Sequence, residues 1–264
     1  MNKLKILGSI SPYCKNNHNC PGYMIYNESC KILMDCGPGI TSKMKMPDDL
    51  ENLTIVISHY HKDHYSDLFS LGYASFCYHR MGGLKNKIKL YIPEVKKGEP
   101  GYEDYLMIIN TKEQYFDIKT YKTNDEIKLN NNTITFFETQ HSIPNRSIKV
   151  ENPDNTIVYT GDMGFSNINN YVDFCKNADI LISEATYLDS DNAKDPNHLH
   201  AKEAAQIANL SGVQMLMLTH FWPEHNKLEY IEEAKPVFAN TVAADESIDI
   251  NLNIFKHQEV KYNR

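Results

Sequence analysis

Four residues of types that bind metal ions lie within one short stretch: His59, His61, Asp63 and His64. Imidazole nitrogens and carboxylate oxygens are common protein ligands of Zn²⁺ and related divalent ions. His59 and His61 are two residues apart, so in an extended backbone their side chains point the same way. Asp63 and His64 follow as the chain turns and can face a second point. A hydrolytic site keeps a position open for water, so we expect two ions, roughly 3.5–4 Å apart, that share a hydroxide.

The segments on either side of this motif predict how it is held. Residues 53–57 are apolar and β-branched, which predicts a buried strand. Residues 66–80 carry apolar side chains at helical spacing, and Ser66 or Asp67 can cap the start of this helix. The motif therefore lies in a turn between a strand and a helix. A polar loop that is rich in histidine by chance could account for one metal-capable residue, but it accounts poorly for four of them in six positions.

Three more metal-capable residues each follow an apolar strand: His141 after 133–139, Asp162 after 156–160 and His220 after 213–218. Sheets with parallel strands place their sites at such strand ends. The first ion is assigned to His59, His61 and His141, and the second to Asp63, His64 and His220. Asp162 can bridge the two ions because a carboxylate has two oxygens. A nitrogen-rich donor set favours Zn²⁺, and the same set also accepts Mn²⁺ or Fe²⁺.

The remaining chain predicts a layered fold. Further strands are expected at 3–9, 22–27, 30–35, 87–92, 147–151, 179–183 and 248–255. Further helices are expected at 102–109, 168–176, 201–210 and 227–239, whereas 113–129 alternates only weakly. Each half reads as several strands followed by strand–helix alternation. This pattern predicts two mixed sheets packed face to face with helices outside, an α+β (α/β) four-layer αββα sandwich. No linker divides the chain, so we expect one domain over 1–264.

The composition narrows the classes of protein. The chain has 264 residues, of which 41% are hydrophobic and 23% charged, as in a globular protein. No apolar run is long enough to span a membrane, and the first residues are too mixed for a signal peptide, so we expect a cytoplasmic protein without membrane partners. The net charge of −7 argues against a general nucleic-acid binder.

The six cysteines have irregular spacing, and a chain of this length can build a core without disulfides. Free thiols are therefore expected. Cys14, His18 and Cys20 are close in sequence, but their spacing is not that of a standard zinc site and no second pair completes it. We expect these three residues to lie in a loop without a metal.

The motif His59-x-His61-x-Asp63-His64, with His141, Asp162 and His220, resembles that of the metallo-β-lactamase superfamily of binuclear hydrolases. The resemblance covers almost the whole chain, and its details are similar to the ribonuclease Z-like branch, including the small YhfI-type metallo-hydrolases. The matching pieces are 33–37, 57–64, 184–186, 198–201 and 218–221. The resemblance implies catalytic roles for Glu184 and His198 beside the metals, with His200 as the main rival of His198. The catalytic candidates are thus Asp63, Glu184 and His198.

Two departures from the ribonuclease Z pattern bear on the substrate. Those enzymes carry a long Gly/Pro-rich arm that grips transfer RNA, and segment 93–110 lacks such an arm. Their His-Ser-Thr string is here His198-Leu199-His200. Transfer RNA is therefore an unlikely partner. Oxygen-reducing di-iron relatives usually carry Glu at the position of His61, which argues against a redox role.

These observations favour a binuclear metal-dependent hydrolase that acts on a small-molecule or nucleotide-like phosphodiester through a hydroxide between its ions. The alternative within enzymes is hydrolysis of a carboxylic ester, thioester or lactone at the same site. A non-catalytic metal-binding or nucleic-acid-binding protein on this fold would usually lack some ligands, and here the set is intact. Tyr60 and Lys62 alternate with His59 and His61 and should point away from the ions. Homodimerisation stays open.

Overall fold

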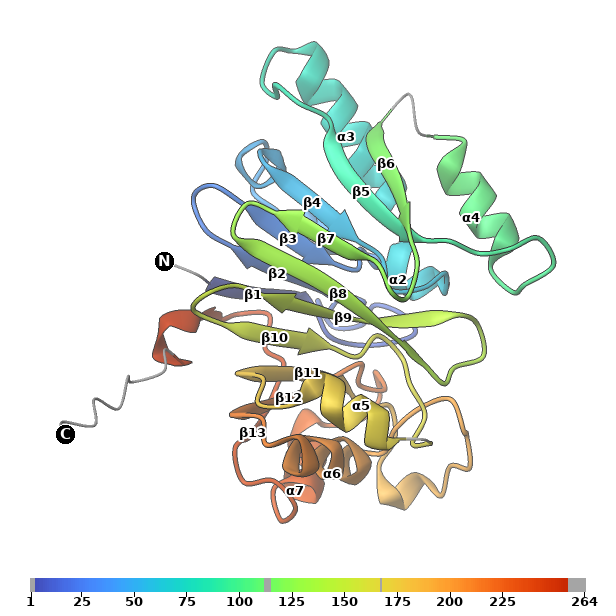
Figure 1. Cartoon of the computed structure of the whole chain (residues 1–264), viewed down its shortest axis with the longest axis vertical. Coiled ribbons are helices and arrows are strands. Elements are labelled where there is room, and N and C mark those ends of the chain that lie inside the picture. The colour runs from blue at the N-terminus through green and yellow to red at the C-terminus, as the bar shows by residue number, and fades with distance from the viewer. Residues whose placement is uncertain (1–2, 112–114, 167, 256–264) are drawn as a thin grey trace.

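The computed structural model describes residues 3–111, 115–166 and 168–255. Two seven-stranded sheets form its centre, and helices cover the outer face of each sheet (Figure 1). The four-layer αββα sandwich predicted from the sequence is therefore confirmed. Within the described ranges, no helix combines the length and apolar character needed to cross a membrane.

The first sheet has the strand order β14-β1-β2-β3-β4-β5-β6. Its strands are β1 (Lys3–Gly8), β2 (Gly22–Tyr26), β3 (Lys31–Met34), β4 (Leu53–Val56), β5 (Ile88–Pro93), β6 (Phe116–Tyr121) and β14 (Asp249–Asn251). The pairs from β3 to β6 are parallel, and those from β14 to β3 are antiparallel.

The second sheet has the strand order β13-β12-β11-β10-β9-β8-β7. Its strands are β7 (Glu126–Leu129), β8 (Asn132–Thr139), β9 (Asn145–Glu151), β10 (Thr156–Tyr159), β11 (Ile180–Glu184), β12 (Met215–Thr219) and β13 (Thr241–Ala243). The pairs from β10 to β13 are parallel, and those from β7 to β10 are antiparallel. Each sheet thus joins an antiparallel half to a parallel half, and the candidate site lies where β4, β8, β10 and β12 end.

Seven helices and three short 3₁₀ segments complete the described chain. The helices are α1 (Ile40–Lys43), α2 (Lys62–Tyr65), α3 (Leu68–Arg80), α4 (Tyr102–Ile109), α5 (Ile168–Cys175), α6 (Ala201–Ser211) and α7 (Lys227–Ala234). The 3₁₀ segments are Asp48–Leu50, Asp189–Asp191 and Leu252–Phe255. In Figure 1, α3 and α4 lie beside the first sheet, and α5, α6 and α7 lie beside the second.

Alternation along β3 shows how the layers are separated. Ile32 and Met34 pack with Ile148 of the second sheet in one apolar cluster, whereas Leu33 packs with Leu71 of α3 in another. Successive side chains of a strand point to opposite faces, so a strand buried on both faces needs apolar residues at every position. This is why β3 and β4 appear in the sequence as continuous apolar runs.

Several boundaries differ from the sequence predictions. The weakly alternating segment contains two edge strands, β6 and β7, in which buried and exposed residues largely alternate because one face of each strand is open to solvent. The predicted strand 248–255 is shorter, since β14 gives way to a 3₁₀ turn. The predicted helix 227–239 ends at Ala234. The three-residue β13 and four-residue α1 are too short to show a period.

The helix expected at 66–80 is α3 (Leu68–Arg80), and a short helix that was not predicted precedes it. α2 begins at Lys62, inside the histidine motif itself, and α3 follows from Leu68. Asp67 is the N-cap residue of α3, as the sequence suggests, but its side chain makes no capping hydrogen bond to the helix. Asp67 instead accepts a hydrogen bond of 2.6 Å from the backbone N–H of Thr41 and so ties α3 to α1.

Candidate metal centre

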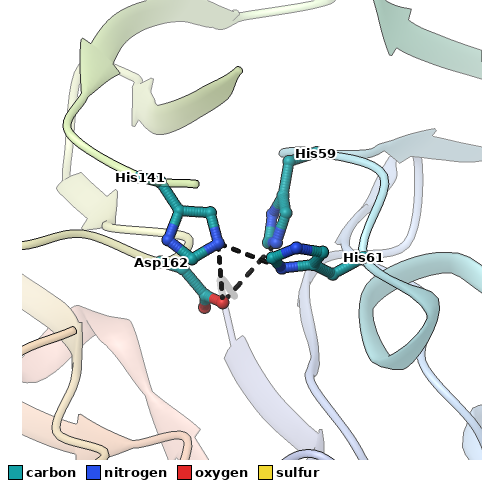
Figure 2. A group of neighbouring side chains, drawn as sticks. All are labelled: His59, His61, His141 and Asp162. Carbon is teal, nitrogen blue, oxygen red and sulfur yellow. Dashed lines mark hydrogen bonds and ion pairs between the residues drawn. The ribbon is translucent and has the colours of Figure 1, made fainter. Parts of the chain in front are cut away.

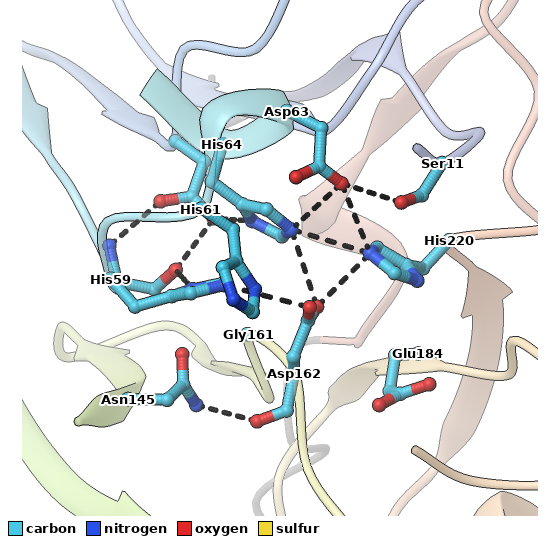
Figure 3. Close-up of polar contacts among 12 residues, drawn as sticks. Ser11, His59, His61, Asp63, His64, Asn145, Gly161, Asp162, Glu184 and His220 are labelled. Carbon is cyan, nitrogen blue, oxygen red and sulfur yellow. Dashed lines mark hydrogen bonds and ion pairs between the residues drawn. The ribbon is translucent and has the colours of Figure 1, made fainter. Parts of the chain in front are cut away.

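The sequence-predicted ligands converge from both sheets on one place. They lie in the β4–α2 loop, in α2, and just past the ends of β8, β10 and β12 (Figures 2 and 3). Two groups of potential ligand atoms form there, His59 with His61, His141 and Asp162, and Asp63 with His64 and His220, and a third, overlapping group joins Asp162 and His220 to His198; the atoms within each group lie within 4.8 Å of one another. The first two groups are the two sets that the sequence predicts.

The first group surrounds one carboxylate oxygen of Asp162 (Figure 2). Asp162 Oδ2 lies 3.5 Å from His59 Nε2 and 3.6 Å from His141 Nε2. His61 Nδ1 lies 3.0 Å from His141 Nε2. Ligands at 2.0–2.1 Å from a tetrahedral zinc ion are about 3.3–3.4 Å apart. The observed separations therefore suit atoms that share one ion.

The second group surrounds the other oxygen of the same carboxylate (Figure 3). Asp162 Oδ1 lies 3.3 Å from His64 Nε2 and 3.1 Å from His220 Nε2. Asp63 Oδ2 lies 3.5 Å from His64 Nε2 and 3.6 Å from His220 Nε2. The Nε2 atoms of His64 and His220 are themselves 3.2 Å apart. Asp162 thus presents one oxygen to each group.

Two ligand atoms are left without hydrogen bonds in the interior. His59 Nε2 and Asp162 Oδ1 are buried and have no hydrogen-bond partner. A buried polar atom without a partner is costly, and a buried charge is normally paired or bound to a metal. Divalent cations at these positions would satisfy both atoms, so the residues present fit a metal centre.

Four of the five histidines use Nδ1 for a hydrogen bond to a partner outside the cluster. The pairs are His59 with Ser58 Oγ (2.9 Å), His64 with Asp35 Oδ2 (2.7 Å), His141 with the Asn197 carbonyl (3.0 Å) and His220 with Thr186 Oγ1 (2.9 Å). Carbonyl and carboxylate oxygens only accept, so Nδ1 of His64 and His141 donates and Nε2 keeps its lone pair for an ion. His61 is the exception and turns Nδ1 inward.

Asp35 is a component of the site that the sequence reasoning did not single out. Its buried carboxylate also accepts hydrogen bonds from the backbone N–H and hydroxyl of Ser58, at 2.7 and 2.8 Å, and from the Tyr159 hydroxyl, at 2.8 Å. It therefore fixes both the start of the histidine motif and the ring of His64. The available signal was its place directly after β3, where a charged residue ends an apolar run.

Glu184 and His198 form the pair that the sequence predicts. Glu184 Oε1 lies 3.0 Å from His198 Nδ1 and accepts a hydrogen bond of 2.9 Å from the Met163 N–H. Burial disfavours charge on His198, but the Glu184 carboxylate outweighs burial and raises the pKa of His198 to about 10. Thr186, also missed from the sequence, donates to Glu184 Oε2 at 2.8 Å and contacts the rings of both His198 and His220.

The electrostatics of the cluster favour a cation. Burial lowers the pKa of His59 well below its usual range and that of His61 to about 4. Burial opposes charge on His64 as well, but Asp162 and Asp63 raise the pKa of His64 well above its usual range. The two buried carboxylates therefore attract positive charge to this point, and a divalent ion can supply it in place of protons.

His200, the rival of His198, lies outside the ligand groups. It is the N-cap residue of α6, and its Nδ1 is 3.3 Å from Glu203. Tyr60 and Lys62 also turn away, as predicted. The Tyr60 hydroxyl donates to the Pro93 carbonyl at 2.6 Å, and Lys62 pairs with Asp104.

Cys14, His18 and Cys20 do not gather around one point. His18 Nδ1 lies 3.2 Å from Glu246, whereas the sulfurs of Cys14 and Cys20 lie 4.0 Å apart. Among the described residues, these three form no group with metal-binding geometry.

Comparison with known proteins identifies a matching family and similar proteins. A family model described as "Beta-lactamase superfamily domain" matches residues 31–221. The probable metallo-hydrolase YhfI of Bacillus subtilis is 27% identical over 243 residues, which cover 91% of this chain and 95% of YhfI. A ribonuclease Z of Archaeoglobus fulgidus is 23% identical over 95% of this chain and 97% of its own length.

Two solved structures have the same fold. The crystal structure of YhfI superposes with a TM-score of 0.85 and 25% identity, covering 94% of this chain and 98% of YhfI. The short form of human tRNase Z superposes with a TM-score of 0.73 and 22% identity, covering 96% of this chain and 99% of the human protein. The shared architecture extends over nearly the whole chain.

Proposed function

The chain belongs to the metallo-β-lactamase superfamily of metal-dependent hydrolases, and from that premise we propose that it is a phosphodiesterase with two divalent ions. The observation that carries the two-ion proposal is the division of Asp162, whose Oδ1 faces His64 and His220 while Oδ2 faces His59 and His141. A carboxylate that serves a single ion has no need of two separate groups of imidazoles.

In this proposal each ion has its own set of side chains. His59, His61 and His141 hold the first, Asp63, His64 and His220 hold the second, and Asp162 bridges them. We assign zinc because imidazole predominates among the donors. When bound, the two ions supply an activated water at neutral pH and stabilise the charge that develops on the phosphoryl oxygens.

His198 is the proposed proton donor to the leaving oxygen. Glu184 holds its Nδ1, which leaves Nε2 as the position from which a proton can be passed on. His198 also lies beside the ligands, since its ring centroid is 5.1 Å from that of His141 and 5.5 Å from that of His220. A group at this position can reach a substrate on the metals without itself being needed to hold them.

Glu184 is proposed to keep His198 oriented and protonated. Both its oxygens are occupied, since Oε1 accepts from the Met163 N–H and Oε2 from Thr186. The carboxylate is therefore fixed from two sides before it meets His198. A carboxylate held in this way can orient an imidazole and stabilise its charged form.

A turnover screen tests the reaction class. Zinc-loaded protein is assayed with bis-(p-nitrophenyl) phosphate, a thioester and a lactone, and zinc is counted in the same preparation. We expect about two ions per chain and the highest kcat/KM on the phosphodiester. Preferential hydrolysis of the thioester or lactone would replace the phosphodiester proposal. Zinc content that stays near zero after loading would remove its basis.

A further inference from the structure

The loop that precedes β2 brings two cysteines together. Lys15 and His18 exchange backbone hydrogen bonds of 3.2 and 2.9 Å, and Asn16 and Asn17 between them both have positive φ. Positive φ at both central residues is the signature of a tight type I′ hairpin turn. This hairpin folds Cys14 back towards Cys20, where their sulfurs lie 4.0 Å apart.

We propose that Cys14 and Cys20 form a reversible disulfide that regulates the metal centre. A disulfide needs a sulfur separation of about 2.05 Å, so the two sulfurs must approach by about 2 Å. Cys14 is exposed and open to reagents, whereas Cys20 is fully buried. Burial also raises the pKa of the Cys20 thiol well above its usual range, so Cys14 is the thiol that reacts first.

The co-reactant is a low-molecular-weight disulfide such as oxidised glutathione. The Cys14 thiolate attacks one sulfur of that disulfide, a mixed disulfide forms, and one glutathione thiolate leaves. Cys20 then loses its proton and attacks the Cys14 sulfur, which forms the Cys14–Cys20 bond and releases the second glutathione. Two protein thiols are oxidised and one glutathione disulfide is reduced to two thiols.

Cys20 lies against the chain that carries Asp63. A Cβ added at Gly37 would lie 2.8 Å from Cys20 Cβ and 2.0 Å from the Asp63 carbonyl oxygen, so Gly37 alone separates them. On the other side of the hairpin, the Ser11 hydroxyl donates a hydrogen bond of 2.5 Å to Asp63 Oδ2 (Figure 3). A bond between Cys14 and Cys20 would therefore move the chain that carries Ser11 and the side chain that packs against Gly37, next to Asp63.

The expected consequence is weaker binding of the ion assigned to Asp63, His64 and His220. Loss of a hydrogen-bond partner outside the ligand set typically costs 10–100-fold in metal affinity, so we expect about a 10-fold loss when Ser11 leaves Asp63. This consequence rests on the proposed two-ion site, whereas formation of the disulfide does not.

The experiment equilibrates zinc-loaded, full-length protein with buffers of reduced and oxidised glutathione. Free thiols are blocked, and tryptic peptides are mapped by mass spectrometry. Trypsin cleaves after Lys15, so a Cys14–Cys20 bond joins peptides 6–15 and 16–31, and fragmentation of the joined pair distinguishes Cys20 from Cys30 in the second peptide. Zinc affinity is measured in the same samples by competition with a chromogenic chelator. We expect the joined peptides to appear under oxidising buffer, to vanish under reducing buffer, and to accompany about a 10-fold loss of zinc affinity.

Two variants serve as controls. Cys14→Ser should abolish both effects, and Cys77→Ser, which removes a thiol on α3 at a distance from this loop, should preserve both. Stable glutathione on Cys14 without the joined peptides would overturn the disulfide. Joined peptides with unchanged zinc affinity would overturn the link to Asp63 while leaving the metal site intact. Failure of the reduced protein to bind zinc would instead overturn the proposed function, and the peptide map would still decide the disulfide.

Discussion

Asp162 is the residue on which the two-ion assignment depends, because its two oxygens face different imidazole groups. Asp162→Asn keeps the shape of the side chain and removes its charge. We expect zinc content to fall from about two ions per chain to less than one, since both ions lose their shared ligand. Elemental analysis after equilibrium dialysis measures this content.

Asp173→Asn makes the same chemical change at an exposed position of α5 and should leave zinc content unchanged. Full zinc binding by the Asp162 variant would show that the carboxylate does not bridge. Loss of a single ion, with normal affinity for the other, would assign Asp162 to one group alone.

Kinetic measurements can distinguish the roles of His198 and Glu184 from those of the metal ligands. His198→Ala should lower turnover by about 10²–10⁴-fold on a phosphodiester with a poor leaving group, the usual share of a general acid. The loss should shrink for bis-(p-nitrophenyl) phosphate, whose leaving group needs little protonation. The zinc content of the His198→Ala variant should equal that of the unchanged protein. His200→Ala is the matched control, because His200 caps α6 and lies outside the ligand groups.

The pH dependence of kcat in Glu184→Gln tests whether Glu184 raises the pKa of His198. A general acid works while it holds its proton, which His198 does below its pKa. Burial opposes that proton and Glu184 restores it, raising the pKa to about 10. Without the carboxylate the pKa falls, so the alkaline decline of kcat should move to lower pH. An unmoved alkaline limb would show that the profile reports another group.

At the scale of elements, Asp35 joins the end of β3 to the loop that follows β4. Asp35→Asn should lower zinc affinity by about 10–100-fold, because the ring of His64 and the backbone of Ser58 lose a charged acceptor. Asp179→Asn is the matched control: this carboxylate is also buried, and it accepts from the Thr156 N–H at the start of β10, away from the metal centre. Equal zinc affinity in the two variants would reduce the role of Asp35 to stability.

In contrast to Asp35, the contact between α2 and α4 should have no effect on zinc binding. Lys62 of α2 pairs with Asp104 and with Tyr65, and its side chain is largely exposed. Exposed ion pairs contribute about 0–1 kcal/mol to stability. Lys62→Ala should therefore leave zinc content unchanged and lower the free energy of unfolding by at most about that amount. A marked loss of zinc would mean that the β4–α2 loop depends on α4 for its shape.

For the whole molecule, strongly buried elements and their ends were predictable from the sequence. β4 and β12 are apolar at nearly every position because both faces are covered, and each delivers ligands where it stops. Asp35 and Thr186 were not predicted as site residues because their roles depend on which distant histidine lies beside them. The edge strands β6 and β7 were not recognised because each alternates over only four to six residues, which is too short a run to stand out in the sequence.

The molecule as a whole also argues against transfer RNA as a substrate. A tRNA-processing enzyme must neutralise many phosphates, and the net charge of −7 gives no general attraction for RNA. Between β5 and β6, the described residues form the eight-residue helix α4 and short connections, with α4 tied back to α2 by Asp104. Nothing in this described region extends as a Gly/Pro-rich arm.

We therefore expect the purified, zinc-loaded protein to remove a 3′ trailer from precursor tRNA at least about 10²-fold more slowly, by kcat/KM, than it hydrolyses its preferred small phosphodiester, a gap of about 2.7 kcal/mol in transition-state stabilisation. Gel analysis of end-labelled precursor over a range of salt concentrations measures this ratio. Low salt should help little, because a chain with a net charge of −7 has no general electrostatic attraction for RNA. Efficient cleavage with a steep salt dependence would show that a local basic surface binds transfer RNA in place of such an arm.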